Sequence, residues 1–326
     1  MIRVGVVGAR GYVGAELVRW ILSDPTLELC AVVSRSDVGQ PLSAMHPGLL
    51  GLTELEITAF SPSTLSELDA VFLAVPHGAA APLAEALDAA GCPIIVDASR
   101  DHRHAPGWVY GQPEWSQHAL SGAKRIAAPG CFATAIALAL APFVDQGLIT
   151  GPVTVCAATG STGSGASPSP GTHHPLRFAN IRAYKVLRHQ HVPEICGFLS
   201  SLGKAPQLAF TPVSAPIDRG ILATCFIPVT PGIDPQAVLH AAYDPHPLIR
   251  VRDGGPEVRH VRGTGFCDVS GFACPDDDPH APQNVVSVIS AIDNLGRGAA
   301  AQAVQALHVA LGHLPTTVSQ TPPNLP

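Results

Sequence analysis

Short apolar runs alternate with amphipathic stretches through the first 130 residues. The apolar runs at 2–7, 27–33, 70–75 and 94–96 have the length of buried strands. Helical patterns with a spacing of three and four residues follow the first and third of these runs. This alternation predicts an α/β fold, a doubly wound parallel sheet of Rossmann type whose strand-end loops line a ligand cleft.

The pattern changes after an alanine-rich helical stretch that runs from Cys131 to about residue 145. Strand-like runs then follow at about 153–158, 207–211, 221–229, 258–262 and 284–292. Turns rich in Pro, Gly and Asp separate them, which indicates an α+β domain with a mostly antiparallel sheet. We therefore expect a nucleotide-binding domain at 1–130 and a catalytic and oligomerisation domain at 131–292. A last helix, about 293–312, is expected to pack back onto the first domain.

Composition excludes several classes of protein. The chain is 46% hydrophobic and only 13% charged, which is typical of a globular protein, and its net charge of −6 does not favour nucleic-acid binding. No apolar run reaches the roughly 20 residues of a membrane span. The chain begins directly with a strand-like run, so a cytoplasmic protein is expected. The eight cysteines include no Cys-x-x-Cys pair, and no zinc-ligand spacing is present, so we expect reduced thiols and no metal.

A glycine motif occupies the first predicted strand–helix turn, with the spacing G-x-x-G-x-x-G at Gly8, Gly11 and Gly14. Glycines there let the backbone approach a pyrophosphate, and the helix N-terminus stabilises its charge. The second strand ends in Ser34-Arg35-Ser36, where NAD enzymes often carry an acid. An arginine and two hydroxyls suit a 2′-phosphate, which indicates NADP. The alternative for Arg35 is a solvated loop residue, and Asp37 lies close by.

Cys131 follows the Pro129-Gly130 turn and opens the long apolar helix. A thiol at a helix N-terminus ionises more easily than an ordinary cysteine, because unpaired N–H groups and the helix dipole favour an anion. Cys131 is therefore a candidate nucleophile, although a cysteine of this kind can also be a small buried apolar residue. His189 and His191 are candidate proton carriers near neutral pH. The sequence does not select between them.

Two further segments could bind an anion. The Gly, Ser and Thr loop around Ser161-Thr162-Gly163 follows a predicted strand, so an ordered anion-binding loop is favoured over a flexible linker. The segment 173–191 carries several Arg, Lys and His residues and no Asp or Glu. It would attract an acidic substrate, or it is simply a solvated basic face.

Eight motifs carry a resemblance to a known family. They are Gly8–Gly14, Ala74–Gly78, Tyr110–Glu114, Pro129–Cys131, Gly160–Gly163, His189–Ile195, Arg219–Ile221 and Ile292–Leu295. Together they resemble the N-acetyl-γ-glutamyl-phosphate reductases, NADP-dependent enzymes of arginine biosynthesis. The similarity spans nearly the whole chain.

The resemblance implies a role for each matching position. Cys131 would be the nucleophile and His191 the acid/base. The cofactor would be held by Gly8, Arg10, Gly11, Tyr12, Val13, Gly14, Ser34, Arg35, Ser36, Pro76 and Asn294. The substrate, a small acyl phosphate, would meet Arg103, Ser161, Thr162, Gly163, His189 and Arg219. The thiolate would form a thioester, and hydride from NADPH would reduce it to an aldehyde. The family also implies a homo-oligomer, a dimer or a tetramer.

Some positions depart from the family pattern, and they leave the substrate open. Ala128 stands where the family has Asn, Gln190 where it has Arg, and Arg100–Arg103 replaces Ala-Asp-Phe-Arg. Thr172–Pro175 and the acid-free basic segment resemble a sister branch, which reduces an aminoadipyl phosphate on a small acidic carrier protein in lysine biosynthesis. An N-succinyl substrate is a further alternative. A silent NADP-binding regulator is disfavoured by the intact cysteine and histidine.

Overall fold

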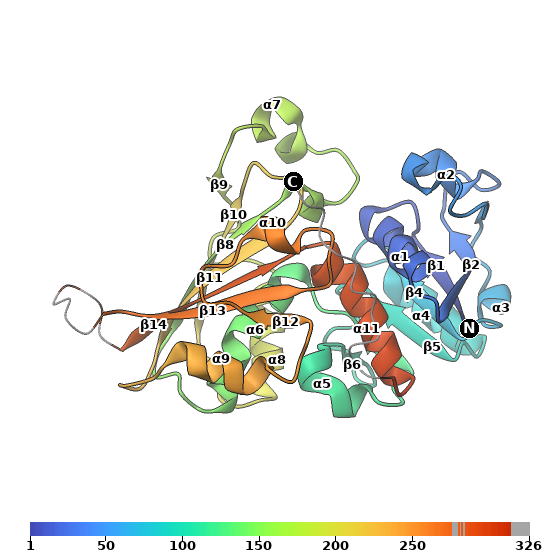
Figure 1. Cartoon of the computed structure of the whole chain (residues 1–326). Helices are drawn as coiled ribbons and strands as arrows, with labels where there is room; N and C mark the ends of the chain where they lie inside the picture. The colour runs from blue at the N-terminus through green and yellow to red at the C-terminus, as the bar shows by residue number, and fades with distance from the viewer. Residues whose placement is uncertain (276–279, 281, 283, 314–326) are drawn as a thin grey trace. The chain divides into compact units, whose positions relative to one another are not determined.

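Two compact units make up the chain in the computed structural model, which describes residues 1–275, 280, 282 and 284–313. The first unit contains Met1–Gly130 and residues 299–313, and the second contains Cys131–Gly298. Each is built on a seven-stranded sheet, and Figure 1 labels the elements of both.

All strand pairs of the first sheet are parallel, which confirms the predicted Rossmann-type sheet. Its order is β3-β2-β1-β4-β5-β7-β6. The strands are β1 Ile2–Val7, β2 Leu27–Val33, β3 Ile57–Thr58, β4 Ala70–Leu73, β5 Ile94–Asp97, β6 Val109–Tyr110 and β7 Arg125–Ala127. All four residues of β4 are buried, as expected for a strand covered on both faces.

The helices of this unit are α1 Tyr12–Ser23, α2 Leu42–Met45, α3 Pro62–Leu65, α4 Ala80–Ala89, α5 Pro113–Leu120 and α11 Ala301–Ala310, with a 3₁₀ turn at Pro47–Leu49. Helix α11 packs against α1 and α5. Buried polar pairs fix it there, because Gln302 donates to Gln112 and His308 Nε2 lies 2.8 Å from Asp24 Oδ2.

The second sheet is mixed but mostly antiparallel, as predicted, in the order β12-β13-β14-β11-β8-β10-β9. Its strands are β8 Val153–Thr159, β9 Arg182–Ala183, β10 Leu208–Ser214, β11 Ile221–Pro228, β12 Ile249–Val251, β13 Cys267–Ala273 and β14 Val285–Ile292. Its helices are α6 Cys131–Asp145, α7 His174–Arg177, α8 His191–Ser200, α9 Pro235–Tyr243 and α10 Val258–Val261, with 3₁₀ turns at Ser161–Ser164 and Pro170–Thr172. A π-helical turn, Gly296–Ala300, follows β14.

One face of the second sheet carries the helices. Helices α6, α8 and α9 pack against its strands (Figure 1). Along β8 and β11, buried residues alternate with more exposed ones, so the opposite face is less covered within this unit.

One strand predicted in the second unit is wrong, and three of its strands, β9, β12 and β13, were not predicted, nor were β3, β6 and β7 in the first unit. Residues 258–261 form the short helix α10, because Val258 packs against Gly220, where a Cβ atom would clash. The sheet instead contains β13, between β12 and β14. This strand mixes apolar residues with the fully buried Asp268 and Ser270. Arg250 on β12 pairs with Asp268 at 2.5 Å, so the partner that lets this carboxylate be buried comes from a neighbouring strand.

Helix α6 is buried on all sides although it contains Pro142 in its interior. A proline there has no N–H for the carbonyl four residues earlier, which is that of Leu138. The hydroxyl of Tyr243, at the end of α9, donates to this carbonyl at 2.6 Å. A side chain from another helix thus replaces the missing backbone hydrogen bond.

We expect Tyr243→Phe to lower the free energy of unfolding by about 1–3 kcal/mol, since a buried carbonyl loses its donor. Pro142→Ala restores a backbone N–H, so Tyr243→Phe should cost less in that background. Denaturant unfolding of the four proteins in this double-mutant cycle measures the difference. Equal losses in both backgrounds would refute the replacement.

Candidate active site

Cys131 is the first residue of α6, in partly exposed surroundings, at the N-terminal end of a helix of 15 residues. This confirms the position expected from the Pro-Gly turn. The first N–H groups of a helix have no partner within the helix, and the dipole is positive there. The location favours an anionic sulfur, which is the nucleophilic form of cysteine.

A glycine lies against the candidate nucleophile. A Cβ atom on Gly298 would lie 2.8 Å from Cys131 Cβ and 3.1 Å from its Cα, closer than real side chains approach. The N–H of Gly298 donates to the carbonyl of Asp293 at 2.8 Å. The turn between these two residues therefore lies directly against the start of α6.

The fully buried carboxylate of Asp293 holds this turn. It accepts the N–H groups of Leu295 and Gly296 at 2.8 and 2.9 Å. It also accepts the N–H of Gly263 and pairs with the guanidinium of Arg219 at 3.0 Å. Arg219, predicted to meet the substrate, is thus engaged by Asp293 in this structure.

His189 and His191 lie together beside Phe132, the neighbour of Cys131. Their rings are 4.8 Å apart between centroids, and they lie 5.2 and 6.1 Å from the Phe132 ring. Both are buried, with 6% and 7% of their surface exposed. Nδ1 of His189 accepts the backbone N–H of His191 at the start of α8, at 3.2 Å. The structure therefore brings both candidate proton carriers next to the nucleophile's helix.

The surroundings of His189 make it a poor acid. Burial, with a smaller contribution from the charge of Lys185, lowers the pKa of His189 to about 4. His189 is therefore neutral near pH 7 and a poor proton donor, and its hydrogen bond orients the first turn of α8. This leaves His191 as the better candidate for the acid/base, in agreement with the resemblance.

Tyr184 is a member of this neighbourhood that the sequence did not reveal. Its ring packs edge-on against His189 at 6.0 Å. Burial, followed by the negative charge of the Cys131 thiolate, raises its pKa well above the ordinary value. The phenol therefore stays protonated and is a hydrogen-bond donor within electrostatic reach of the sulfur. Its position two residues after Arg182 in an extended segment was the available signal.

The Gly160–Gly163 loop is ordered, but its donors are largely engaged. The N–H groups of Gly160, Ser161 and Thr162 donate to the carbonyls of Gly220, Ile217 and Asp218, each at 3.0 Å. The side-chain amide of Asn294 donates to Thr162 Oγ1 at 3.0 Å and accepts the N–H of Gly220 at 2.6 Å. The loop is thus tied to two other loops. Direct anion binding by Ser161, Thr162 and Gly163 remains a prediction, as does the contact of Asn294 with a nicotinamide.

In the first unit the glycine turn has the shape that a pyrophosphate needs. Gly8 has φ 91°, a conformation that favours glycine, and Gly11 is the N-cap of α1. A Cβ on Gly14 would clash with the carbonyl of Gly8, so α1 packs directly on the turn. Backbone and helix N-terminus together can hold a phosphate group.

The end of β2 lies beside this turn. Nη1 of Arg10 donates to Ser36 Oγ at 2.9 Å, and Nε lies 3.2 Å from Asp37. Arg10 thus offsets the acid that made a 2′-phosphate site uncertain from the sequence, and Arg35 is exposed nearby. The residues at the end of β2, together with Arg10, therefore fit the 2′-phosphate of NADP.

Arg103 is buried in the first unit and contacts backbone. Its Nε donates to the carbonyl of Ala128 at 3.0 Å, three residues before Cys131, and Nη2 donates to Ala98. The neighbouring His102, where the family has Phe, lies 2.6 Å from the buried Asp97 and stacks on Trp108. Arg103 thus supports the segment that leads into α6, and its predicted contact with substrate is untested.

Across the described residues, no cluster of three or more His, Cys, Asp or Glu side chains could hold a metal ion. Over the same part of the chain, no helix combines the length and apolar character needed to cross a membrane.

Family models match both units. One is described as the NAD binding domain of semialdehyde dehydrogenase, over residues 3–123, and the other as its dimerisation domain, over residues 131–294. The chain belongs to the semialdehyde dehydrogenase family. A probable aspartate-semialdehyde dehydrogenase from Pseudomonas aeruginosa shares the fold, with a TM-score of 0.77 at 20% identity over 96% of this chain and 99% of that one.

Relatives of this chain confirm the resemblance drawn from the motifs. The N-acetyl-gamma-glutamyl-phosphate reductase of Salinispora arenicola is 39% identical over 97% of this chain and 96% of its own length. The enzyme of the same name from Frankia casuarinae is 37% identical, over 98% of each chain. A putative [LysW]-L-2-aminoadipate 6-phosphate reductase from Thermomicrobium roseum is also 37% identical, over 100% of this chain and 99% of its own.

We expect Gly298→Ala to displace Cys131 and to lower kcat by at least tenfold, because the added Cβ cannot fit against the first turn of α6. The rate of Cys131 alkylation by iodoacetamide should change as well. Gly255→Ala, in the same unit, at a glycine with open space around it and no positive φ, is the control. Unchanged kcat and alkylation in Gly298→Ala would show that the contact does not position the nucleophile.

The lowered pKa of His189 makes a pH prediction. Between pH 6.5 and 4 the unfolded chain takes up a proton at this site and the folded chain does not, so His189 makes the protein less stable as the pH falls. The slope from this one group is at most about 1.4 kcal/mol per pH unit. His189→Gln should flatten the dependence, measured by denaturant unfolding across this range. Parallel curves for the two proteins would contradict a neutral buried His189.

Proposed function

We propose that this chain catalyses the NADPH-dependent reduction of N-acetyl-γ-glutamyl phosphate to N-acetylglutamate semialdehyde, with release of phosphate, in arginine biosynthesis. The observation that carries the proposal is Cys131 at the N-terminus of α6 with His191 buried beside the adjacent Phe132. Relatives of this name, up to 39% identical over nearly the whole chain, support it.

The chain's own residues account for the acyl transfer. The Cys131 thiolate attacks the acyl-phosphate carbonyl, the C–O bond to phosphate breaks, and a thioester forms. Bound NADPH supplies the hydride that reduces this thioester. The C–S bond then breaks, which releases the aldehyde and restores the thiolate. The overall reaction consumes one proton, and His191 is the group placed to deliver it to the departing phosphate.

The first unit supports NADP as the cofactor. The turn from Gly8 to Gly14 would take the pyrophosphate at the N-terminus of α1. Arg10, Ser36 and Arg35 would surround the 2′-phosphate, since Arg10 already reaches Ser36. The family model that matches this unit is an NAD binding domain. An aspartate semialdehyde dehydrogenase from Candida albicans, which shares the fold, has a crystal structure with NADP.

A second candidate is the reductase of a carrier-linked aminoadipyl phosphate. The Thermomicrobium roseum relative favours it, as does the absence of Asp and Glu from the sequence between residues 146 and 193. An acid-free segment of this length would attract an acidic carrier. An N-succinyl substrate is a closer variant of the main proposal.

The proposal includes a cytoplasmic homo-oligomer, a dimer or a tetramer. The match of residues 131–294 to a dimerisation domain supports it. The less covered face of the second sheet carries exposed Cys156 and Phe226 on neighbouring strands. A second copy of the chain could cover this face.

Turnover of chemically defined substrates tests the function. Cys131→Ser should lower the reduction of free N-acetyl-γ-glutamyl phosphate at least 10³-fold, since its hydroxyl is a far weaker nucleophile. His191→Asn should lower it about 10²- to 10⁴-fold. Cys196→Ser, on the same helix as His191, is the control and should keep full activity.

The choice of substrate decides between the candidates. Reduction of the free acyl-glutamyl phosphate by the wild-type chain supports the main proposal. Failure with that substrate, together with reduction of the carrier-linked aminoadipyl phosphate, would replace it with the second candidate.

A further inference from the structure

Two arginines of the second unit lie near the ends of neighbouring strands without an acidic partner: Arg177 donates to the carbonyl of Thr159, and Arg182 pairs with Ser214, the strand neighbour of Thr159. Arg177 ends α7, and Arg182 begins β9. Neither belongs to any ion pair formed by the described residues, and the sequence has no Asp or Glu between 146 and 193. Burial and then the positive charge of Arg182 lower the pKa of Arg177. Like charges held together without a carboxylate repel each other unless an anion binds between them.

Most donors of the two guanidinium groups remain available. Nη2 of Arg177 donates to the carbonyl of Thr159 at 3.3 Å, while its buried Nε has no hydrogen-bond partner among the described residues. Nη2 of Arg182 donates to the carbonyl of Gly171 at 3.2 Å. A guanidinium carries five N–H donors, so each contact uses one. The remaining donors suit an oxyanion, which accepts several at once.

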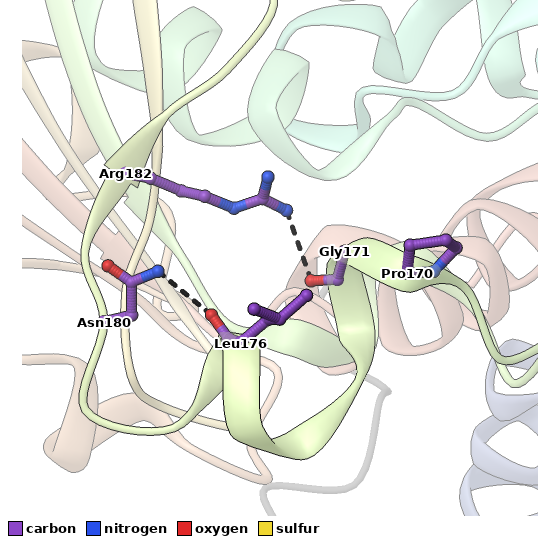
Figure 2. Close-up of a pocket in the computed structure, with 5 residues that line it drawn as sticks. All are labelled: Pro170, Gly171, Leu176, Asn180 and Arg182. Carbon is purple, nitrogen blue, oxygen red and sulfur yellow. Dashed lines mark hydrogen bonds between the residues drawn. The ribbon is translucent and has the colours of Figure 1, made fainter.

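Arg182 lines a pocket of about 270 Å³ that gives an anion room to enter. The other lining residues are Pro170, Gly171, Leu176 and Asn180 (Figure 2). The Asn180 amide is turned to the carbonyl of Leu176 at 3.0 Å, so Arg182 is the charged group of this pocket. A Cβ on Gly171 would lie 2.6 Å from Arg182 Nη2, so the glycine leaves space for the guanidinium.

Tyr184 connects the two arginines with the nucleophile. Its backbone N–H donates to the carbonyl of Pro212 at 3.1 Å, which continues the extended run from β9. Arg182 and Tyr184 are therefore on the same side of that run. The Tyr184 ring lies 6.0 Å from that of His189, which lies 5.2 Å from the ring of Phe132, the residue after Cys131. The charges of Arg177, Arg182 and Cys131 all act on this phenol. Non-glycine residues with positive φ, Lys185 at 43° and Leu187 at 57°, shape the turn that follows.

We propose that Arg177, Arg182 and the hydroxyl of Tyr184 form a binding subsite for an oxyanion of the substrate, beside the thiol of Cys131. The inference rests on the proposed function, because an acyl-glutamyl phosphate carries two such groups, its phosphate and its carboxylate. The subsite gives a role to the acid-free stretch in a chain with a net charge of −6.

The reverse reaction separates the two oxyanions, since it takes phosphate and the semialdehyde as distinct substrates. Arg177→Gln and Arg182→Gln should each raise one KM at least fivefold and change kcat less. A higher KM for phosphate assigns the subsite to the phosphate, and a higher KM for the semialdehyde assigns it to the carboxylate. Arg188→Gln, which removes the same charge from the same segment, is the control. Increases below fivefold in both KM values overturn the proposal.

A second variant keeps the charge and moves the group. Gly171→Ala should displace the Arg182 guanidinium and raise the same KM as Arg182→Gln, with unchanged thermal unfolding. If Gly171→Ala leaves both KM values at the wild-type level while Arg182→Gln raises one, the proposed placement of Arg182 is wrong.

Calorimetric titration of the full chain with inorganic phosphate and with N-acetylglutamate is independent of turnover. Binding of either ligand to the wild type, weakened at least fivefold in Arg177→Gln but not in Arg188→Gln, supports the subsite even if the chain does not reduce the expected substrate. Equal binding by the wild type, Arg177→Gln and Arg188→Gln overturns the subsite, whatever the activity assays show. Absence of binding of both ligands to the wild type overturns it as well.

Discussion

The contact between Gly298 and Cys131 is the constraint that fixes the candidate nucleophile in the second unit. Backbone meets the first turn of α6 here with no side chain between them. The approach is possible because Asp293 gathers two N–H groups of its own turn, one of Gly263 and the guanidinium of Arg219 around one buried carboxylate. A buried charge with this many donors is stable and fixes its surroundings.

Several other features of the fold help to hold the start of α6 in place. Helix α6 is apolar on every side, so its N-terminus can be held rigidly inside the unit. Tyr243 offsets the donor lost at Pro142, and α8 begins at the histidine that faces Phe132. Each of these contacts joins segments distant in sequence, so the position of the sulfur results from packing over much of the second unit.

Much of this organisation could be predicted from the sequence, because it depends on local pattern. The parallel strands of the first unit follow from short apolar runs between helical stretches. The glycine turn and Cys131 at a helix start follow from Gly and Pro, which have strong local preferences. The prediction of a strand at 258–262 was wrong. Val258 and Val261 have a spacing that also suits one side of a helical turn, and in the structure this turn packs Val258 against Gly220.

The rest depends on neighbours that a sequence does not display. His189 and His191 look equivalent in the chain, and the lowering of the pKa of His189 by burial and Lys185 could not be read from it. Arg219, the ion-pair partner of Asp293, is 74 residues away in the sequence. The charge of Arg182 acts on Arg177 because the chain between them folds back. These are effects of burial and of charges close in space, and the spacing of residues along the sequence does not predict them.

The central claim is that Cys131 carries the acyl group during the reaction. The most direct measurement is mass spectrometry of the chain after it is mixed with N-acetyl-γ-glutamyl phosphate in the absence of NADPH. The account predicts one N-acetylglutamyl group per active site on the peptide that contains Cys131, formed together with an equal amount of phosphate. Release of phosphate with Cys131 unmodified, or acylation of another residue in its place, would contradict it.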